Sequence, residues 1–296
     1  MKYSHKKAFS LIEILGVLLI IGVVMASILG SRKIVSISRL SAARNLTSFA
    51  PVNSIEGLVL WLDATSKEAF DDGADEDGTS ISNWYDINQR SLEKYDVSTS
   101  SPNQPTYRRE AIHKLPALEF DGSNDYLTGS NLIEVTGNPD ITVFIVANVV
   151  EDGGGDSQRA LQIGPATGSN AGLSVAFDLD GSFRFNNGNQ VFSSQKGFPV
   201  IVTYRRNMGD QYNEGEIWAN GFKLSQTSES SGSNKPVIDP EEIIVGAGKS
   251  SAGSIYGPID GYMGEVIVFN NSLTDEEIED VNTYLSKKWK IDLDSN

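Results

Sequence analysis

The sequence predicts a mainly β protein, in which a long N-terminal transmembrane α-helix precedes an antiparallel jelly-roll β-sandwich with a C-terminal helix. Phe9 to Gly30 is an apolar run of 22 residues that contains one charge. From residue 54 onward, short segments rich in Val, Ile, Phe and Trp alternate with turn signals. Helical spacing of apolar residues returns only near the C-terminus, at 274–291.

The net charge of −15 over 296 residues is distributed unevenly. Residues 1–50 hold seven Lys or Arg and one acid, a net +6, which leaves −21 for the rest of the chain. The acidic body is a poor ligand for nucleic acid, since contacts with phosphates favour dense Lys and Arg. The absence of cysteine excludes disulfides and thiolate metal sites.

The apolar run is long enough to span a bilayer, which takes about 20 helical residues. It is longer than the apolar region of a signal peptide, which has about 7–15 residues. Ala26 and Ser27 are small residues of the kind found at signal-peptide cleavage sites, so a signal peptide stays an alternative. Glu13 is its only charge, and an acid held in hydrocarbon usually has a partner.

The residues around Glu13 resemble the prepilin cleavage and methylation motif of type IV pilins and pseudopilins. Lys6–Ala8 matches the end of a basic leader, and Phe9–Glu13 matches the start of the mature chain. The resemblance implies that a prepilin peptidase cuts after Ala8 and methylates the amine of Phe9. It also implies that Glu13 pairs with the terminal amine of a neighbouring pilin or pseudopilin subunit during assembly. One departure is Ala8 itself, because leaders of this family most often end in Gly.

Near-helical spacing of Ile34, Ile37 and Leu40 predicts that the helix continues beyond the membrane until Pro51 ends it. Such a rod has too little core of its own, so we expect it to pack with partner helices. The predicted parts are a leader (1–8), a transmembrane and assembly helix (9–50), a linker (51–56) and a jelly roll (57–293).

The body contains eight strand candidates and two hairpin turns, Asp180-Gly181 and Asn220-Gly221, whose residues tolerate the positive φ of a type I′ turn. The candidates are Leu58–Leu62, Ile141–Val150, Leu173–Leu179, Phe183–Phe185, Val200–Tyr204, Glu216–Ala219, Ile243–Val245 and Glu265–Phe269.

The C-terminal helix is predicted from a capping box, Thr274 with Glu277, ahead of an apolar stripe. Lys287, Lys288 and Lys290 stand at its negative end. The stripe consists of Ile278, Val281, Leu285 and Trp289.

Four phrases of the body resemble bacterial laminin-G-like members of the concanavalin A-like lectin/glucanase superfamily: Gly57–Ala64, Leu115–Leu127, Glu216–Phe222 and Gly264–Ile278. The resemblance implies a jelly roll that binds carbohydrate or surfaces, often with calcium, or that serves only as a structural module.

No catalytic residue is assigned. Glucanases of this superfamily place carboxylates at alternate positions of one strand, so that they share a face. The nearest match, Glu119–Ser123, has serine where the second essential acid should be, and Glu214 with Glu216 lacks a third member. We therefore expect a binding protein; a membrane-anchored glycosidase and a ligand-free surface module are the alternatives.

Asp121, Asn124 and Asp125 are candidate calcium ligands, because this cation prefers several oxygen atoms. The competing interpretation is an Asp-Gly turn. The acidic stretch 71–78 lacks the full spacing of a calcium loop. The aromatic residues that could stack on sugars are Trp84, Tyr85, Tyr107, Tyr126, Tyr212 and Tyr256.

Together these patterns predict a pilin-like or pseudopilin-like subunit of a type IV pilus or type II secretion system. Its helix would sit in the bacterial inner membrane before assembly, and its lectin-like body would lie in the periplasm or at the cell surface. The expected partners are a prepilin peptidase, other subunits, the membrane and glycans. No cofactor is expected beyond the candidate calcium.

Overall fold

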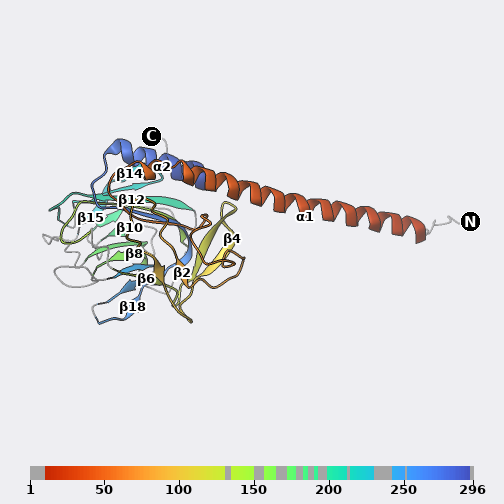
Figure 1. Cartoon of the computed structure of the whole chain (residues 1–296), viewed down its shortest axis with the longest axis horizontal. Helices are drawn as coiled ribbons and strands as arrows, with labels where there is room; N and C mark the ends of the chain where they lie inside the picture. The colour runs from red at the N-terminus through yellow and green to blue at the C-terminus, as the bar shows by residue number, and fades with distance from the viewer. Residues whose placement is uncertain are drawn as a thin grey trace, which may run out of the picture.

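The computed structural model describes residues 11–130, 135–149, 157–164, 172–177, 183–185, 190–192, 199–211, 214–229, 242–250 and 252–293. The protein is mainly β, with one helix at each end, as predicted. Helix α1 (Leu11–Ser48) projects from the body as a rod, and its last turns lie beside helix α2 (Asp275–Trp289) (Figure 1). A 3-10 turn (Pro51–Asn53) leads from α1 into the first strand.

The first sheet has eight strands: β1 (Leu58–Asp63), β4 (Thr106–Ile112), β5 (Leu115–Asp121), β7 (Ile141–Val149), β12 (Val200–Arg206), β13 (Glu216–Ala219), β14 (Phe222–Lys223) and β19 (Asp260–Phe269). Their order is β14-β13-β12-β7-β19-β5-β4, and β1 also pairs with β19. The long strand β19 therefore has β7 on one side, and β5 and β1 in succession on the other.

The second sheet has nine strands: β2 (Asn83–Trp84), β3 (Val97–Ser98), β6 (Leu127–Gly129), β8 (Gln158–Ile163), β9 (Leu173–Phe177), β10 (Phe183–Phe185), β11 (Gln190–Phe192), β15 (Gln226–Glu229) and β16 (Ile243–Val245). Their order is β15-β11-β10-β9-β8-β16-β6-β3-β2. A small hairpin, β17 (Gly248–Lys249) with β18 (Ile255–Tyr256), stands apart from both sheets.

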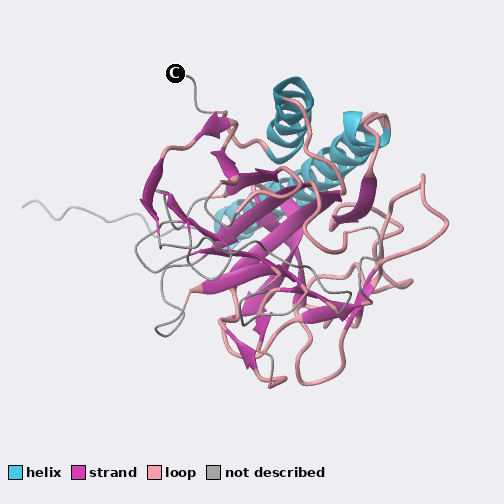
Figure 2. Ribbon diagram, turned by 90° about the vertical axis from the view of Figure 1, so that its left-hand side faces the viewer, coloured by secondary structure: helices cyan, strands magenta, loops and turns pink. Residues whose placement is uncertain are grey.

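The two sheets and the helices form three layers (Figure 2). Ile145 of the first sheet and Leu161 of the second belong to one buried apolar core between the sheets. The other face of the first sheet carries a second core, in which Phe144 and Ile267 pack with Trp289 of α2 and Ala43 of α1. The first sheet is thus buried on both faces, which explains the nearly continuous apolar character of β1, β7 and β19.

Local sequence signals place several elements correctly. Thr274 and Glu277 form the predicted capping box of α2, and the apolar stripe of that helix is buried. Asn220 and Gly221 both have positive φ, 48° and 77°, in the turn between β13 and β14. The Asp180-Gly181 turn lies outside the described residues.

The N-terminal part departs from the prediction in detail. Helix α1 ends at Ser48, two residues earlier than predicted, and Pro51 starts the 3-10 turn. Val52 and Ile55, assigned to a linker, are buried in the second core. Within the described part of the chain, no helix combines the length and the apolar character that a membrane span requires.

Candidate functional site

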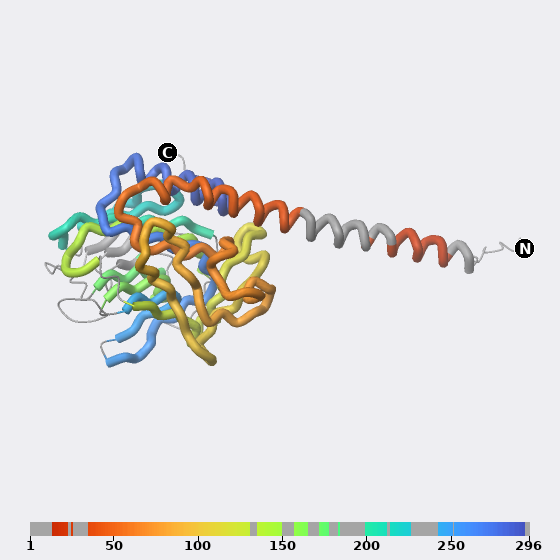
Figure 3. The backbone as a smooth tube through the Cα atoms, in the orientation of Figure 1, coloured from red at the N-terminus to blue at the C-terminus, as the bar shows by residue number. Residues whose placement is uncertain are grey.

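The first functional feature is a band of exposed apolar side chains around the N-terminal half of α1. Leu19 is 71% exposed and Ile14 is 51% exposed, although Leu and Ile side chains are usually buried in folded proteins. Figure 3 shows the same rod leaving the body. A contiguous exposed apolar surface marks a site of contact with a membrane or with other proteins. The other residues of this apolar band are Leu15, Val17, Leu18, Ile20, Ile21 and Met25.

The residues predicted to be processed or to guide assembly lie beyond what the structure places. Ala8 and Phe9 are outside the described residues, and so is the side chain of Glu13. Backbone placement begins at Leu11, and Glu13 lies in the first turn of α1. The roles of these three residues therefore stay predictions.

The second feature is a buried ionic junction that joins α1, α2 and the first sheet. The ammonium of Lys288 lies 2.6 Å from an oxygen of Asp63 and 2.7 Å from an oxygen of Glu265, and all three side chains are fully buried. Lys288 also donates to the hydroxyl of Tyr284 at 3.1 Å. The sequence suggested only that Lys288 complements the helix dipole; instead its charge lies in the interior.

Each carboxylate of the ionic junction accepts four hydrogen bonds. The indole N–H groups of Trp61 and Trp289 each lie 2.8 Å from Glu265, which also accepts from Tyr284 and Lys288. Burial raises the pKa of Glu265, and Lys288 opposes that rise. Burial and then the charge of Glu265 hold the pKa of Tyr284 well above 10.0, which keeps its hydroxyl a donor.

Asp63 links the ionic junction to α1. Its oxygens accept from Lys288, from the amide and hydroxyl of Thr65, and from the hydroxyl of Thr47 at 2.9 Å. One turn earlier on α1, Nε of Arg44 donates to the carbonyl of Thr65 at 2.7 Å. The end of α1 is therefore fixed to the body by polar contacts as well as by apolar packing.

Sequence reasoning missed this junction, although a signal was present. Asp63 ends the apolar run Leu58–Leu62, and Glu265 starts the apolar run Val266–Phe269. An acid directly beside an apolar run of this kind indicates a buried partner. The sequence could not show that the partner is Lys288, because the pairing of β1 with β19 and the docking of α2 bring the three together.

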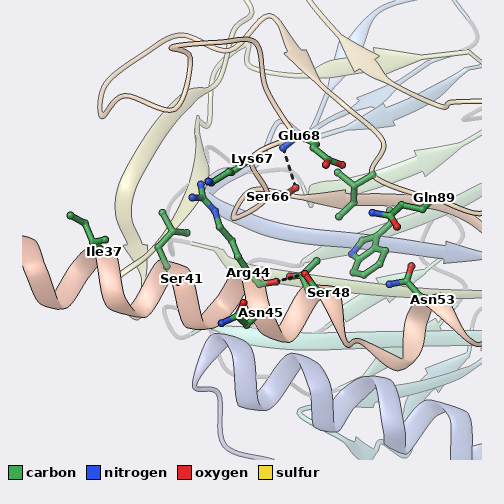
Figure 4. Close-up of a pocket in the computed structure, with 14 residues that line it drawn as sticks. Ile37, Ser41, Arg44, Asn45, Ser48, Asn53, Ser66, Lys67, Glu68 and Gln89 are labelled. Carbon is green, nitrogen blue, oxygen red and sulfur yellow. Dashed lines mark hydrogen bonds between the residues drawn. The ribbon is translucent and has the colours of Figure 1, made fainter.

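A groove of about 760 Å³ opens on one side of α1, between this helix and the loops that follow β1 and β2 (Figure 4). We call it the junction groove. The apolar residues that line it are Ile37, Leu40, Trp61 and Ile87. The polar residues that line it are Ser41, Arg44, Asn45, Thr47, Ser48, Asn53, Ser66, Lys67, Glu68 and Gln89. On the other side of α1, a groove of about 570 Å³ is lined by Arg39, His113, Lys114, Lys287 and Lys290 among others.

The candidate calcium ligands form a hydrogen-bonded turn. One oxygen of Asp121 accepts from the amides of Ser123 and Asn124, and one oxygen of Asp125 accepts from the amide of Asp121. The amide of the Asn124 side chain donates to the carbonyl of Pro102 at 2.6 Å. Within the described residues, no group of three or more His, Cys, Asp or Glu side chains is arranged to hold a metal.

We expect Asp125 to titrate near pH 6. Burial, and then the charge of Asp121, raise its pKa from 3.8 to about 6. Because the folded state then holds the proton more tightly, the free energy of unfolding should fall as pH rises from about 4 to 6. Asp125→Asn should remove this dependence. Carboxyl-carbon NMR measures the midpoint directly, and a value near 4 would contradict the expectation. Calcium binding at this turn stays a prediction; added calcium would lower the midpoint if Asp125 were a ligand.

The acids considered for glycoside hydrolysis are engaged by neighbours. Glu119 forms an ion pair with Arg108 at 2.6 Å and accepts from the hydroxyl of Tyr262 at 3.1 Å. Glu216 forms ion pairs with Arg205 and Lys223, and these lower its pKa against the opposing effect of burial. Both carboxylates are therefore held by ion pairs within the first sheet.

The candidate aromatic platform is not one surface. Trp84 and Tyr107 belong to the core between the sheets, so neither can stack on a sugar. Tyr85, Tyr126 and Tyr256 are half-buried, and Tyr212 lies outside the described residues. In the acidic stretch 71–78, Asp71 accepts from the hydroxyl of Tyr85 at 2.6 Å.

Comparison with known proteins bears on both parts of the chain. Residues 3–29 match the prokaryotic N-terminal methylation motif. The binding domain of botulinum neurotoxin serotype D is similar in structure, with a TM-score of 0.52 and 14% identity over 79% of this chain and 52% of that one. A Trypanosoma rangeli sialidase in complex with 2,3-difluorosialic acid has a TM-score of 0.51 and 18% identity over 79% of this chain and 33% of that one.

The chain thus spans about a third of the sialidase and about half of the toxin domain. At these identities the likeness shows the fold alone. No curated protein sequence matches the chain. The chain carries a prokaryotic N-terminal methylation motif at residues 3–29, ahead of a body with a two-sheet β fold.

Proposed function

We propose that the chain is a pilin-like or pseudopilin-like subunit whose helix α1 assembles with the helices of other subunits. Cleavage after Ala8 by a prepilin peptidase and methylation of Phe9 precede assembly. The observation that carries the proposal is the methylation motif at residues 3–29, continuous with a helix whose apolar side chains are exposed. Such side chains are stable only in a bilayer or against other apolar helices.

In this proposal, the apolar part of α1 holds the chain in the inner membrane before assembly, with the β-sandwich in the periplasm. After assembly the β-sandwich stands on a pilus or on a secretion pseudopilus. A body of two sheets is bulky beside a single helix, and it would crowd a tightly packed filament. We therefore propose a minor or tip subunit that contributes adhesion.

We further propose that the jelly-roll body binds carbohydrate without cleaving it. The fold supports binding, because the toxin neighbour is a binding domain and a sialidase neighbour holds a sialic acid derivative. The engagement of Glu119 by Arg108 and Tyr262 supports the absence of glycoside hydrolysis. The polar lining of the junction groove supplies amides and hydroxyls of the kind that sugars bind.

Filament fractionation tests the proposal in the source cell. We expect the chain in the sheared surface or pseudopilus fraction, in small proportion relative to the main subunit. Ala8→Leu, which enlarges the residue at the cleavage site, should retain the chain in the membrane fraction, whereas Ala8→Gly should not. Recovery of the Ala8→Leu chain in filaments would contradict processing at this site, and finding the chain as the repeating bulk of a filament would contradict a minor role.

A further inference from the structure

The junction groove has an unusual charge arrangement for an acidic body. The side chains of Arg44, from α1, and Lys67, from the loop after β1, point toward one another at its mouth, while Glu68 points away (Figure 4). Among the described residues, neither Arg44 nor Lys67 has a carboxylate partner within ion-pair distance. Two cations held together without an anion form a local site for a negative charge.

The helix side of the groove is fixed in place. Arg44 is half-buried, and its Nε is held by the carbonyl of Thr65 at 2.7 Å, which leaves the remaining guanidinium N–H groups for a ligand. Ser41 and Ser48 lie on the same face of α1 as Arg44, because residues three and four apart share a helix face. Asn45, the residue after Arg44, also lines the groove. The ionic junction beneath the groove anchors this part of α1 through Thr47.

The groove also needs hydrogen-bond donors. The side-chain oxygen of Asn53, which lines the groove, is buried and has no hydrogen-bond partner within the described structure. An unpaired buried acceptor costs free energy, so an incoming donor is favoured. Asn45 and Gln89 add two further side-chain amides, which can donate and accept.

We infer that the junction groove binds a saccharide bearing a carboxylate, such as a uronic or sialic acid. Arg44 and Lys67 hold the carboxylate, and Asn53, Asn45 and Gln89 bind hydroxyl groups. Inorganic phosphate fits less well, since it would satisfy the cations but offers few donors to the amides. A volume of about 760 Å³ lies within the range of small-ligand sites. This inference rests on the proposed carbohydrate binding and specifies its ligand class and site.

Binding to the full-length chain in nanodiscs tests the inference. The probes are digalacturonate and sialyllactose, each compared with its methyl ester, which has the same sugar framework without the charge. We expect each acid to bind at least tenfold more tightly than its ester. Lys67→Gln should weaken binding of the acids about tenfold, because one charge-assisted contact is lost, and should leave the esters unchanged.

The matched control is Lys287→Gln, which removes the same charge from an exposed lysine in the groove on the other side of α1. It should leave binding of the acids unchanged. Asn53→Ala should weaken both acids and esters. Lys67 is exposed and, within the described structure, forms no ion pair, so its replacement leaves the fold intact.

Three outcomes overturn the inference. If acids and esters bind equally and Lys67→Gln has no effect, the ligand class and site are wrong while carbohydrate binding stands. If no saccharide binds at all, the proposed carbohydrate function fails too. If Lys67→Gln, unlike Lys287→Gln, lowers filament incorporation without affecting acid binding, the groove receives an acidic segment of a neighbouring subunit.

Discussion

Lys288→Met is expected to lower the free energy of unfolding by about 3–5 kcal/mol, the cost of removing one partner from a buried ion pair. The substitution removes the charge that faces both Asp63 and Glu265. Two fully buried carboxylates would then lie near one another without a cation. Their remaining hydrogen bonds, from Trp61, Trp289 and other donors, cannot compensate for the lost charge.

The loss should depend on pH. Without Lys288, burial and the charge of Asp63 raise the folded-state pKa of Glu265 above its unfolded value with no cation to oppose them. A raised pKa means that protonation restores stability. The loss in the free energy of unfolding caused by Lys288→Met should therefore be smaller near pH 5 and larger near pH 8. Urea unfolding of the full chain in detergent, followed by tryptophan fluorescence, measures both effects.

Lys287→Met provides the matched control for Lys288→Met. Lys287 is the preceding residue of α2, but its side chain is exposed, so its replacement should change stability by less than about 0.5 kcal/mol. Equal effects at the two positions would show that the ionic junction contributes nothing beyond surface charge.

Glu13→Gln is expected to reduce incorporation into filaments by about two orders of magnitude. In the proposed assembly, the Glu13 carboxylate meets a terminal amine exposed by cleavage. Removing the carboxylate leaves that cation unpaired in an apolar setting, at a cost of about 2.5–3.5 kcal/mol. The measurement is the amount of chain in the sheared filament fraction relative to the membrane fraction.

Glu13→Asp tests the charge separately from the length of the side chain. It keeps the carboxylate and should retain most of the incorporation that Glu13→Gln loses. Normal incorporation of the Glu13→Gln chain would mean that α1 assembles through apolar packing alone.

Elements with local signals could be predicted from the sequence. The capping box at Thr274 and the stripe through Val281 and Trp289 need only residues within one helix, and the structure confirms them. Asn220-Gly221 is a local turn, and it too is confirmed. The methylation motif was recognisable because its residues are consecutive.

Features built from distant residues could not be predicted. Asp63 is more than 200 positions from both Glu265 and Lys288 in the sequence. The pairing of β1 with β19 and the position of α2 bring the three side chains together. Trp84 and Tyr107 follow loop-like segments in the sequence, yet the structure buries both between the sheets. The junction groove likewise depends on how the end of α1 docks beside loops of the body.

The mass of the mature N-terminus shows whether the chain is processed as a prepilin. The chain is recovered from the filament fraction of its source cell, and its N-terminal peptide is measured by mass spectrometry. We expect a chain that begins at Phe9 with a methylated amine. A chain that still begins at Met1 would contradict processing and assembly, and would leave only an anchored β-sandwich.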